Sequence, residues 1–326
     1  MRHFTIFAVA LLLTLATAGA GPATAQSEPT VRRLAGTTRI ETAIAISVDS
    51  YDTDQASAVI LARSDLFPDA LAGGPLAAVN NGPLLLTPPT ELVQAVGDEI
   101  GRVLPDGGEV FLLGGQAALS ADVEAAVAEL GYAPRRLSGN SRYDTALAIA
   151  RESAPAPGFI TIATGNDFPD ALIGGSLATA FADGVMVLTN GDQLTPSVQA
   201  YLDDNSDVDK TTIGPAAAAA FPSAFNVAGP NPSARSVVAA QVFYSRINPT
   251  GVTVASVERF PDGLAGAAHA FDAGLLPLLL TPSAELPQAH IDYITSLDAS
   301  GRSYVYGGNL AVAERVVDQM RAALNS

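Results

Sequence analysis

Three aspartates recur in the same short phrase of this sequence and have the chemistry of a site. Asp69, Asp170 and Asp262 each follow Phe-Pro, in phrases at residues 67–74, 168–175 and 260–267. Such a carboxylate ligates a metal, acts as a base or accepts a hydrogen bond from a sugar hydroxyl. The structural interpretation is that it satisfies free backbone amides at the start of a predicted helix. Both interpretations place it at the carboxyl end of a strand, where open α/β sheets bind ligands.

Two arginines in the first turn of predicted helices are the candidates for holding an anion. Arg39 follows Thr38 and Arg142 follows Ser141, and each hydroxyl residue has an acidic residue three positions on, as in a capping box. Helix N-termini attract anions, and an arginine adds a planar fork of donors. The alternative is an ion pair with a neighbouring domain. The third copy has no arginine in register, since Arg235 is nearby but shifted.

Three threonines, Thr87, Thr189 and Thr281, end predicted strands and complete the set of candidate ligand-binding residues. Each of them either reaches a ligand or bonds to the following turn. The sequence contains no G-x-S-x-G nucleophile elbow and no H-E-x-x-H zinc pair. No pair of carboxylates is singled out by its spacing as a glycosidase dyad. We therefore predict no catalytic residue, no metal site and no cofactor.

These residues belong to a repeat. Four landmarks keep their order along the chain: an early glycine, the Phe-Pro-Asp phrase, an apolar strand ending in threonine, and a glycine after a later strand. The Phe-Pro-Asp phrase recurs after 101 and then 92 residues, and the other landmarks follow similar steps. A period of this length indicates a small domain rather than a solenoid unit. Three such modules are more typical of multivalent binding than of one asymmetric active site.

Within one copy, short apolar runs alternate with helical patterns. The first copy has predicted strands at 58–62, 83–87 and 109–113, helices starting near residues 38, 69, 92 and 120, and a short strand at 135–137 that enters the next copy. Continuous apolar strands are typical of a sheet that is buried on both faces. The alternation predicts right-handed βαβ units and a mainly parallel sheet. We therefore expect three small three-layer α/β domains.

The first 25 residues have the pattern of a secretory signal peptide. Arg2 precedes an apolar stretch at 4–18, and a small-residue cleavage site ends at Ala25. The apolar stretch is short for a membrane span, and no later segment is long enough for one. We expect a secreted chain in which residues 26–32 form a short linker.

The chain has a net charge of −16 and no cysteine. A protein of this charge does not bind nucleic acid or anionic lipid through its overall field. An anionic ligand therefore requires a local cationic site or a bridging divalent cation. Without cysteine there are no disulfides and no thiolate metal sites.

Several motifs recur in the first two copies with little change. They are an R-L-x-G-x-x-R-[YI]-[DE]-T-A opening at 33–43 and 136–146, an F-P-D-A-L-x-x-G-x-L-A phrase at 67–77 and 168–178, P-L-L-L-T strands, and a V-x-x-[LI]-G-G strand end. These motifs resemble those of the bacterial type 2 cell-wall-binding repeat family. The resemblance extends from about residue 33 to the C-terminus and is weaker in the third copy.

The resemblance implies three tandem Rossmann- or toprim-like domains in a pseudo-threefold arrangement, an intramolecular pseudo-trimer. We place the repeats at 33–134, 135–225 and 226–326, with the third divergent. It also implies a protein held on the cell wall by non-covalent binding to an anionic polymer.

We therefore predict a secreted, monomeric, non-catalytic protein that binds an anionic wall glycopolymer or peptidoglycan and anchors itself at the cell surface. Two alternatives stay open. A cell-envelope hydrolase acting on peptidoglycan or wall polysaccharide would have one asymmetric carboxylate or metal cluster. A surface-array or adhesin component would assemble with copies of itself.

Overall fold

The computed structural model describes residues 30–326. The predicted signal peptide at 1–25 and residues 26–29 of the predicted linker lie outside this part. The described residues form three four-stranded sheets in which every strand pairing is parallel. We call each sheet with its helices a unit. No helix among these residues is long and apolar enough to cross a membrane.

Unit 1 has the sheet order β3-β2-β4-β5. Its elements are α1 (Arg39–Ser50), β2 (Ala58–Arg63), α2 (Gly73–Val79), β3 (Leu84–Thr87), α3 (Gln94–Val103), β4 (Glu109–Leu113), α4 (Ala121–Glu129) and β5 (Ala133–Leu137). The helix predicted from Asp69 begins only at Gly73. Before it, the amides of Ala70 and Gly73 bond three residues back, so this segment forms tight turns instead of α-helix.

Unit 2 has the equivalent order β7-β6-β8-β9. Its elements are α5 (Arg142–Ser153), β6 (Phe159–Thr164), α6 (Pro169–Thr179), β7 (Gly184–Thr189), α7 (Pro196–Asp204), β8 (Lys210–Ile213), α8 (Gly214–Ala220) and β9 (Phe225–Val227). This unit is shorter because α8 starts directly at the end of β8, without the turn that separates β4 from α4.

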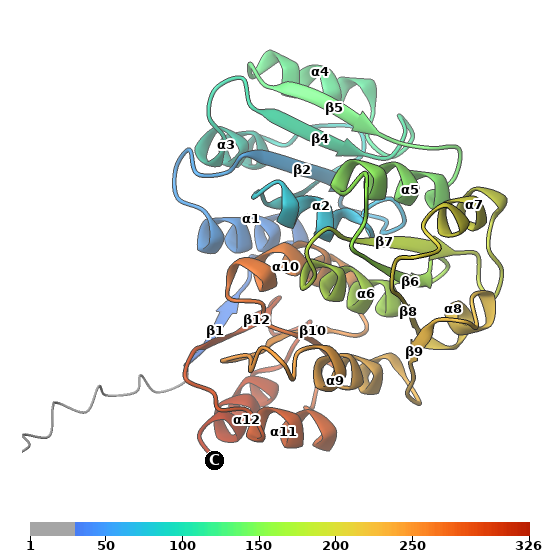
Figure 1. Ribbon diagram of the computed structural model, residues 1–326. Coiled ribbons are helices and arrows are strands. Elements are labelled where there is room, and N and C mark those ends of the chain that lie inside the picture. Colours follow the sequence, from blue (N-terminus) through green and yellow to red (C-terminus); the bar gives the residue numbers. More distant parts are fainter. Residues whose placement is uncertain (1–29) are drawn as a thin grey trace, which may run out of the picture.

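Unit 3 has the order β11-β10-β12-β1, so its fourth strand comes from the start of the chain (Figure 1). Its elements are α9 (Pro232–Phe243), β10 (Thr253–Ser256), α10 (Phe260–Asp272), β11 (Leu278–Thr281), α11 (Gln288–Thr295), β12 (Arg302–Tyr306), α12 (Glu314–Leu324) and β1 (Thr30–Leu34). Residues 30–32, which we expected in a linker, thus begin a strand that pairs with the open edge of β12.

The sheets divide the chain differently from the sequence repeats. The opening strand of each later repeat lies in the sheet of the preceding unit, as β5 pairs with β4 and β9 pairs with β8. β1 takes the same place in unit 3. The three units therefore form a closed ring instead of a linear array.

Each sheet separates two apolar cores. In β2, Ile60 and Ala62 face a central core shared by all three units, whereas Val59 and Leu61 face an outer core of unit 1 alone. Helices α2, α6 and α10 pack against one another in the middle of the molecule, and α3 and α4 cover the outer face of unit 1 (Figure 1). Each unit thus has an inner helix, a sheet and outer helices. The predicted α/β fold with pseudo-threefold arrangement is confirmed.

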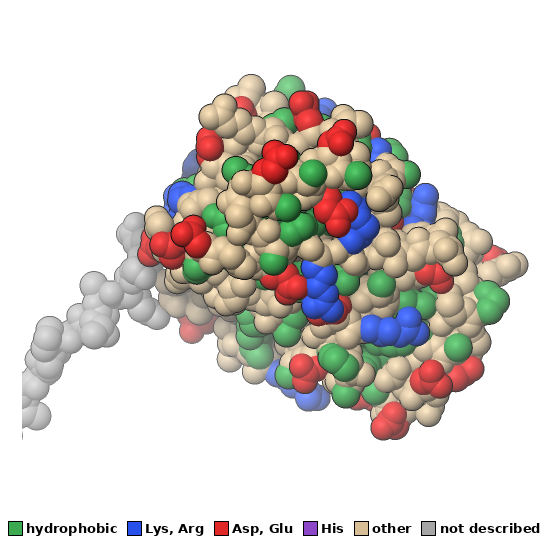
Figure 2. Space-filling model, turned by 90° about the horizontal axis from the view of Figure 1, so that it is seen from above, with side chains coloured by type: hydrophobic (Ala, Val, Ile, Leu, Met, Phe, Trp, Pro, Cys, Tyr) green, Lys and Arg blue, Asp and Glu red, His purple; other side chains and the backbone are tan. Residues whose placement is uncertain are grey.

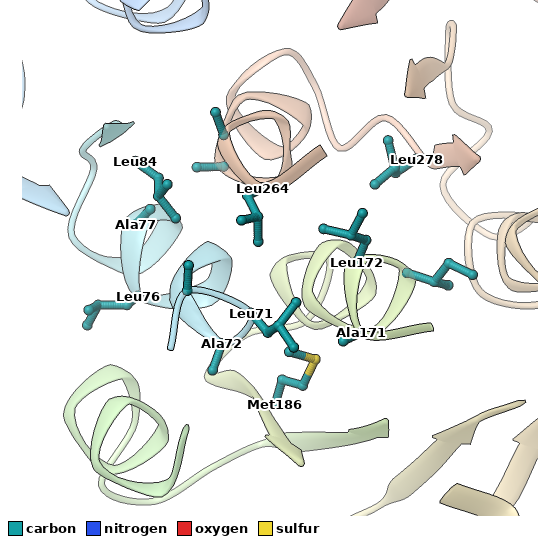
Figure 3. Packing of buried hydrophobic residues seen from close by; sticks show 14 of the residues in the cluster. Leu71, Ala72, Leu76, Ala77, Leu84, Ala171, Leu172, Met186, Leu264 and Leu278 are labelled. Carbon is teal, nitrogen blue, oxygen red and sulfur yellow. The ribbon is translucent and has the colours of Figure 1, made fainter. Parts of the chain in front are cut away.

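Small residues allow the three central helices to approach closely. A Cβ atom added to Gly74 would lie 2.9 Å from the Cβ of Ala267, closer than side-chain carbons normally come. Gly74, Gly175 and Ala267 occupy equivalent places in the three copies. Around this contact pack the leucines of the repeated phrases, Leu71, Leu172 and Leu264 (Figure 3).

Candidate functional site

The repeated Phe-Pro-Asp phrase lies at the centre of the ring. The rings of Phe67, Phe168 and Phe260 form a triangle with centroid separations of 5.7, 5.7 and 6.0 Å. Tilted and edge-on rings at such distances attract one another. The phrase therefore joins the three units. Of this phrase only the aspartate is among the residues predicted from sequence, although the phenylalanine recurs in all three copies as well.

Asp170 and Arg235 form a buried ion pair between units 2 and 3. Arg235 Nε and Nη2 donate to Asp170 Oδ1 and Oδ2 at 2.7 and 2.9 Å. In the sequence, Arg235 is shifted from the register of Arg39. Counting six residues from the glycine that opens each repeat instead places it at the position of Thr42 and Thr145.

The other two units make the same contact with a threonine. Thr145 hydrogen-bonds to Asp69 between units 1 and 2, and Thr42 hydrogen-bonds to Asp262 between units 3 and 1. Burial raises the pKa of both carboxyl groups, and the hydrogen bonds act against this rise. The pKa of Asp170 is raised in the same way. All three predicted aspartates therefore connect neighbouring units.

Arg39 and Arg142 also occupy equivalent places, in the first turns of α1 and α5. Their Nη1 atoms donate to the carbonyls of Ser64 and Gly165, both at 2.7 Å. The guanidinium of Arg39 also lies 5.5 Å from the ring centre of Phe260. Among residues 30–326, no carboxylate forms an ion pair with either arginine. Their remaining N–H groups are available to an anion.

A crevice of about 580 Å³ opens between unit 3 and unit 1 beside Arg39. Its lining includes Arg259 as a second cation, and Glu258 and Asp262 as anions. Carboxylates near the arginines favour a ligand that also presents hydroxyl donors or arrives with a cation. The crevice thus suits a sugar that carries an acidic group.

The helix N-terminus beside this crevice is already occupied. The amides of Thr37 and Thr38 donate to Glu41 Oε2 at 2.6 and 3.1 Å, which completes the predicted capping box. These hydrogen bonds lower the pKa of Glu41. The amides of Thr37, Thr38 and Glu41 are thus already bonded, and an anion in the crevice would be held mainly by arginine side chains.

The three predicted threonines are buried. Thr87, Thr189 and Thr281 are fully inaccessible to solvent. Their hydroxyls donate to main-chain carbonyls of the following turn at 2.8, 2.7 and 3.2 Å. They hold the turns after β3, β7 and β11, and the structure does not bring them to the surface of the crevice.

Acidic and basic side chains lie interspersed on the face of the molecule that Figure 2 shows. Arg63 pairs with Asp65 and Arg136 pairs with Glu124. No three His, Asp or Glu residues within 30–326 are grouped so that they could hold a metal ion. A site for an anion on this acidic protein would therefore depend on a few arginines and not on its overall charge.

The sequence model of cell wall binding domain 2 matches two segments, residues 33–124 and 136–219. The chain belongs to the cell wall binding domain 2 family. The third unit lies mostly outside these matches, but it has the same sheet order as the two matched units. This cell wall binding domain 2 protein therefore contains a third, divergent copy of the fold.

Two Bacillus subtilis (strain 168) proteins are relatives in sequence. The chain is 26% identical to N-acetylmuramoyl-L-alanine amidase LytC over 306 residues, and this aligned region covers 91% of the chain and 59% of the amidase. It is 35% identical to an amidase enhancer over 162 residues, and this aligned region covers 50% of the chain and 22% of the enhancer. The cell wall binding domain 2 chain thus spans about three fifths or less of these relatives.

Two solved structures from Clostridium difficile have the same fold. Cwp8 matches with a TM-score of 0.80 at 22% identity, over 91% of this chain and 52% of its own. Cwp6 matches with a TM-score of 0.81 at 21% identity, over 96% of this chain and 51% of its own. Both matches cover all three units of this cell wall binding domain 2 protein, including the divergent one.

Proposed function

We propose that the protein binds an anionic wall glycopolymer non-covalently, with Arg39 and Arg142 as the groups that hold its phosphates or carboxylates. The observation that carries this proposal is the state of these two side chains. They occupy equivalent places at two interfaces between units, and within residues 30–326 neither forms an ion pair with a carboxylate, in a chain of net charge −16. Arginines of this kind are well suited to bidentate anion recognition.

The protein would have two such anion-binding sites, one at Arg39 and one at Arg142. In the third interface the arginine at the opening helix, Arg235, is engaged with Asp170. Two sites on one rigid ring would bind a repetitive polymer with a higher retention than either site alone. Asp262 lies in the same crevice as Arg39 and would accept hydrogen bonds from sugar hydroxyls or share a divalent cation with the polymer.

The remaining parts of the proposal concern the whole protein. We infer secretion from the predicted signal peptide, a monomer from the ring closed by its own first strand, and retention at the cell surface from family membership. We also infer that the chain itself does not hydrolyse wall polymers. Zymography of purified protein tests that inference, and a cleared zone on a wall-containing gel would contradict it.

Co-sedimentation with purified cell walls tests the binding proposal. One arm uses intact walls, and the other uses walls from which anionic polymers have been extracted with acid. We expect wild-type protein to bind intact walls and to lose most of its binding on extracted walls. The double variant Arg39→Ala/Arg142→Ala should bind intact walls roughly tenfold or more weakly, because each lost charge-assisted hydrogen bond contributes about 1.5–3 kcal/mol.

The matched control is Arg315→Ala/Arg321→Ala. It removes the same charge from exposed arginines of α12 that pair with Glu285, Glu314 and Asp318. This variant should bind intact walls like wild type. Equal binding by the Arg39/Arg142 variant and wild type would show that these arginines are not the polymer site.

A further inference from the structure

The contact between the last strand of each sheet and the helix that follows it differs in chemistry among the three units. In unit 1, Arg135 of β5 forms an ion pair with Glu152 of α5. At the equivalent place in unit 3, Arg32 of β1 forms an ion pair with Asp49 of α1. Two of the three units therefore join the last strand of the sheet to the next helix by an arginine–carboxylate pair.

Unit 2 has an apolar pair at this position. Phe225 of β9 stands in the place of Arg135, and Val242 of α9 stands in the place of Glu152. Phe225 is 53% exposed and Val242 is 44% exposed. Side chains that stay this exposed gain little from folding. An exposed apolar pair at a position that the other units fill with charges indicates contact with something outside the fold.

The apolar pair borders a pocket of about 760 Å³. In unit 1 the corresponding space is filled by Tyr132, which is 8% exposed and donates to the carbonyl of Leu104 at 3.4 Å. Register from the adjoining strand places the exposed Pro222 where unit 1 has Tyr132. The equivalent of Leu104, Ser206, lines the pocket. Unit 2 thus has no tyrosine to fill this space.

Aromatic rings form one wall of the pocket. Phe225 packs edge-on against Phe243, with ring centres 5.9 Å apart, and Phe243 contacts Phe159 and Phe181 behind it. Phe243 therefore packs against rings on both sides, and the wall is formed without a ligand. An aromatic surface of this kind is suited to the apolar C–H face of a sugar ring.

The rim of the pocket is acidic. Asp203 and Asp209 line it, and the one lysine beside them is engaged elsewhere. Lys210 Nζ donates to the carbonyls of Asn205 and Val208, and burial lowers the pKa of its ammonium group. Carboxylates are acceptors only, so they select hydroxyl and N–H donors and repel anions. The pocket therefore disfavours an anionic ligand and suits one with an apolar face and several donors.

We propose that this pocket, with Phe225 and Phe243 as its wall and Asp203 and Asp209 as its acceptors, binds an uncharged N-acetylated sugar unit of a glycan. An acetamido group offers a methyl group to the rings and an N–H to a carboxylate, and the pyranose hydroxyls supply further donors. The site is separate from the crevice of Arg39 and does not depend on the function proposed for it.

The test is calorimetric titration of the purified protein with chitotriose, an uncharged trimer of N-acetylglucosamine. We expect saturable binding to wild type and weaker binding of cellotriose, which lacks the acetamido groups. The variant Phe225→Arg/Val242→Glu restores the ion pair of unit 1 and should bind chitotriose at least about tenfold more weakly. Phe225→Ala provides a second variant without a new charge, and Asp203→Asn/Asp209→Asn tests the acceptors.

Arg39→Ala/Arg142→Ala should bind chitotriose like wild type, which separates this proposal from the one for the anionic polymer. The absence of binding to wild type, or equal binding by wild type and both Phe225 variants, would overturn the sugar site. Light scattering could also overturn the sugar site. If wild type formed a concentration-dependent dimer that Phe225→Arg/Val242→Glu abolished, the surface of Phe225 and Val242 would be an interface between copies.

Discussion

Arg235 and Asp170 join units 2 and 3 through two parallel hydrogen bonds in a buried site. The two side chains are 6% and 7% exposed as residues, and the bonds measure 2.7 and 2.9 Å. The other two interfaces use a threonine at the same place. The divergent repeat therefore has a buried ion pair where the other two have an aspartate–threonine hydrogen bond, and it has no arginine in the register of Arg39 and Arg142.

Arg235→Ala should destabilise the protein strongly. Removing one member of a buried ion pair leaves the other charge unpaired, which costs about 3–5 kcal/mol. We expect a loss of about 3 kcal/mol in the free energy of unfolding, measured by guanidinium denaturation and circular dichroism. Arg235→Thr should lose less, because threonine at this position already bonds to the aspartate in units 1 and 2.

The control for this measurement is Arg315→Ala, since Arg315 is exposed and pairs with the exposed Glu285. Its effect should stay within about 0.5 kcal/mol. If Arg235→Ala were as mild as this control, the pair would contribute no more than a surface ion pair.

The strands of the sheets could be predicted from sequence because they are buried on both faces. Residues 58–62 are apolar throughout, and β2 occupies nearly the same segment. The closure of the ring could not be predicted in this way. β1 carries Arg32 and Arg33, is only partly buried, and pairs with β12 from the far end of the chain. Its place is set by the free edge of β12, which is a tertiary feature.

For the candidate site, the places of the arginines on helices were predictable from sequence, but the contacts between units were not. Periodicity placed Arg39 and Arg142 on helix starts, and the structure has them there. Which carboxylate faces which helix depends on how the units are arranged around the ring. The contact of Asp170 with Arg235 therefore required the structure, although the register of the opening glycines contained the signal.

Removal of residues 30–35 should destabilise unit 3 specifically. The truncation exposes the edge of β12 and removes Leu34, which is 4% exposed in the central core. We expect the melting temperature to fall by roughly 5 °C or more, on the scale of about 2–4 °C per kcal/mol for proteins of this size. A free parallel edge also favours association between molecules.

Scanning calorimetry and size-exclusion chromatography with light scattering measure both effects. The control is a chain that begins at Thr30 and so retains β1. A truncated chain that melts with this control and elutes as a monomer would show that β1 does not hold the ring closed.

The aromatic triangle should show energetic coupling across units. Phe260→Ala removes contacts with Phe67, Phe168 and the guanidinium of Arg39. We expect a loss of about 2–3 kcal/mol in the free energy of unfolding, because the rings are only half-buried. A double-mutant cycle of Phe67→Ala and Phe168→Ala should give a coupling of about 1 kcal/mol. Strictly additive losses would mean that the rings contribute through burial alone.

His290 should make the stability of the protein depend on pH. It replaces a buried valine, since the equivalent residues are Val96 and Val198. Its Nε2 donates to the carbonyl of Leu280 at 2.9 Å, and its Nδ1 has no hydrogen-bond partner within residues 30–326. Burial lowers the pKa of this imidazole below its ordinary value of about 6.5.

The direction of this pH dependence follows from whether the folded or the unfolded state binds the proton more readily. Below pH of about 6.5 the unfolded chain takes up a proton at this position that the folded protein resists, so stability falls as the pH falls. Above that pH the group is neutral in both states and has no effect. For one proton the slope of the free energy of unfolding is at most about 1.4 kcal/mol per pH unit.

His290→Val should therefore melt at a similar or higher temperature at pH 8. It should also lose less stability than wild type between pH 7.5 and 5.5. Thermal melts of both proteins across this range measure the difference, which cancels the contributions of the carboxylates they share. Parallel curves would show that His290 is not the group that titrates.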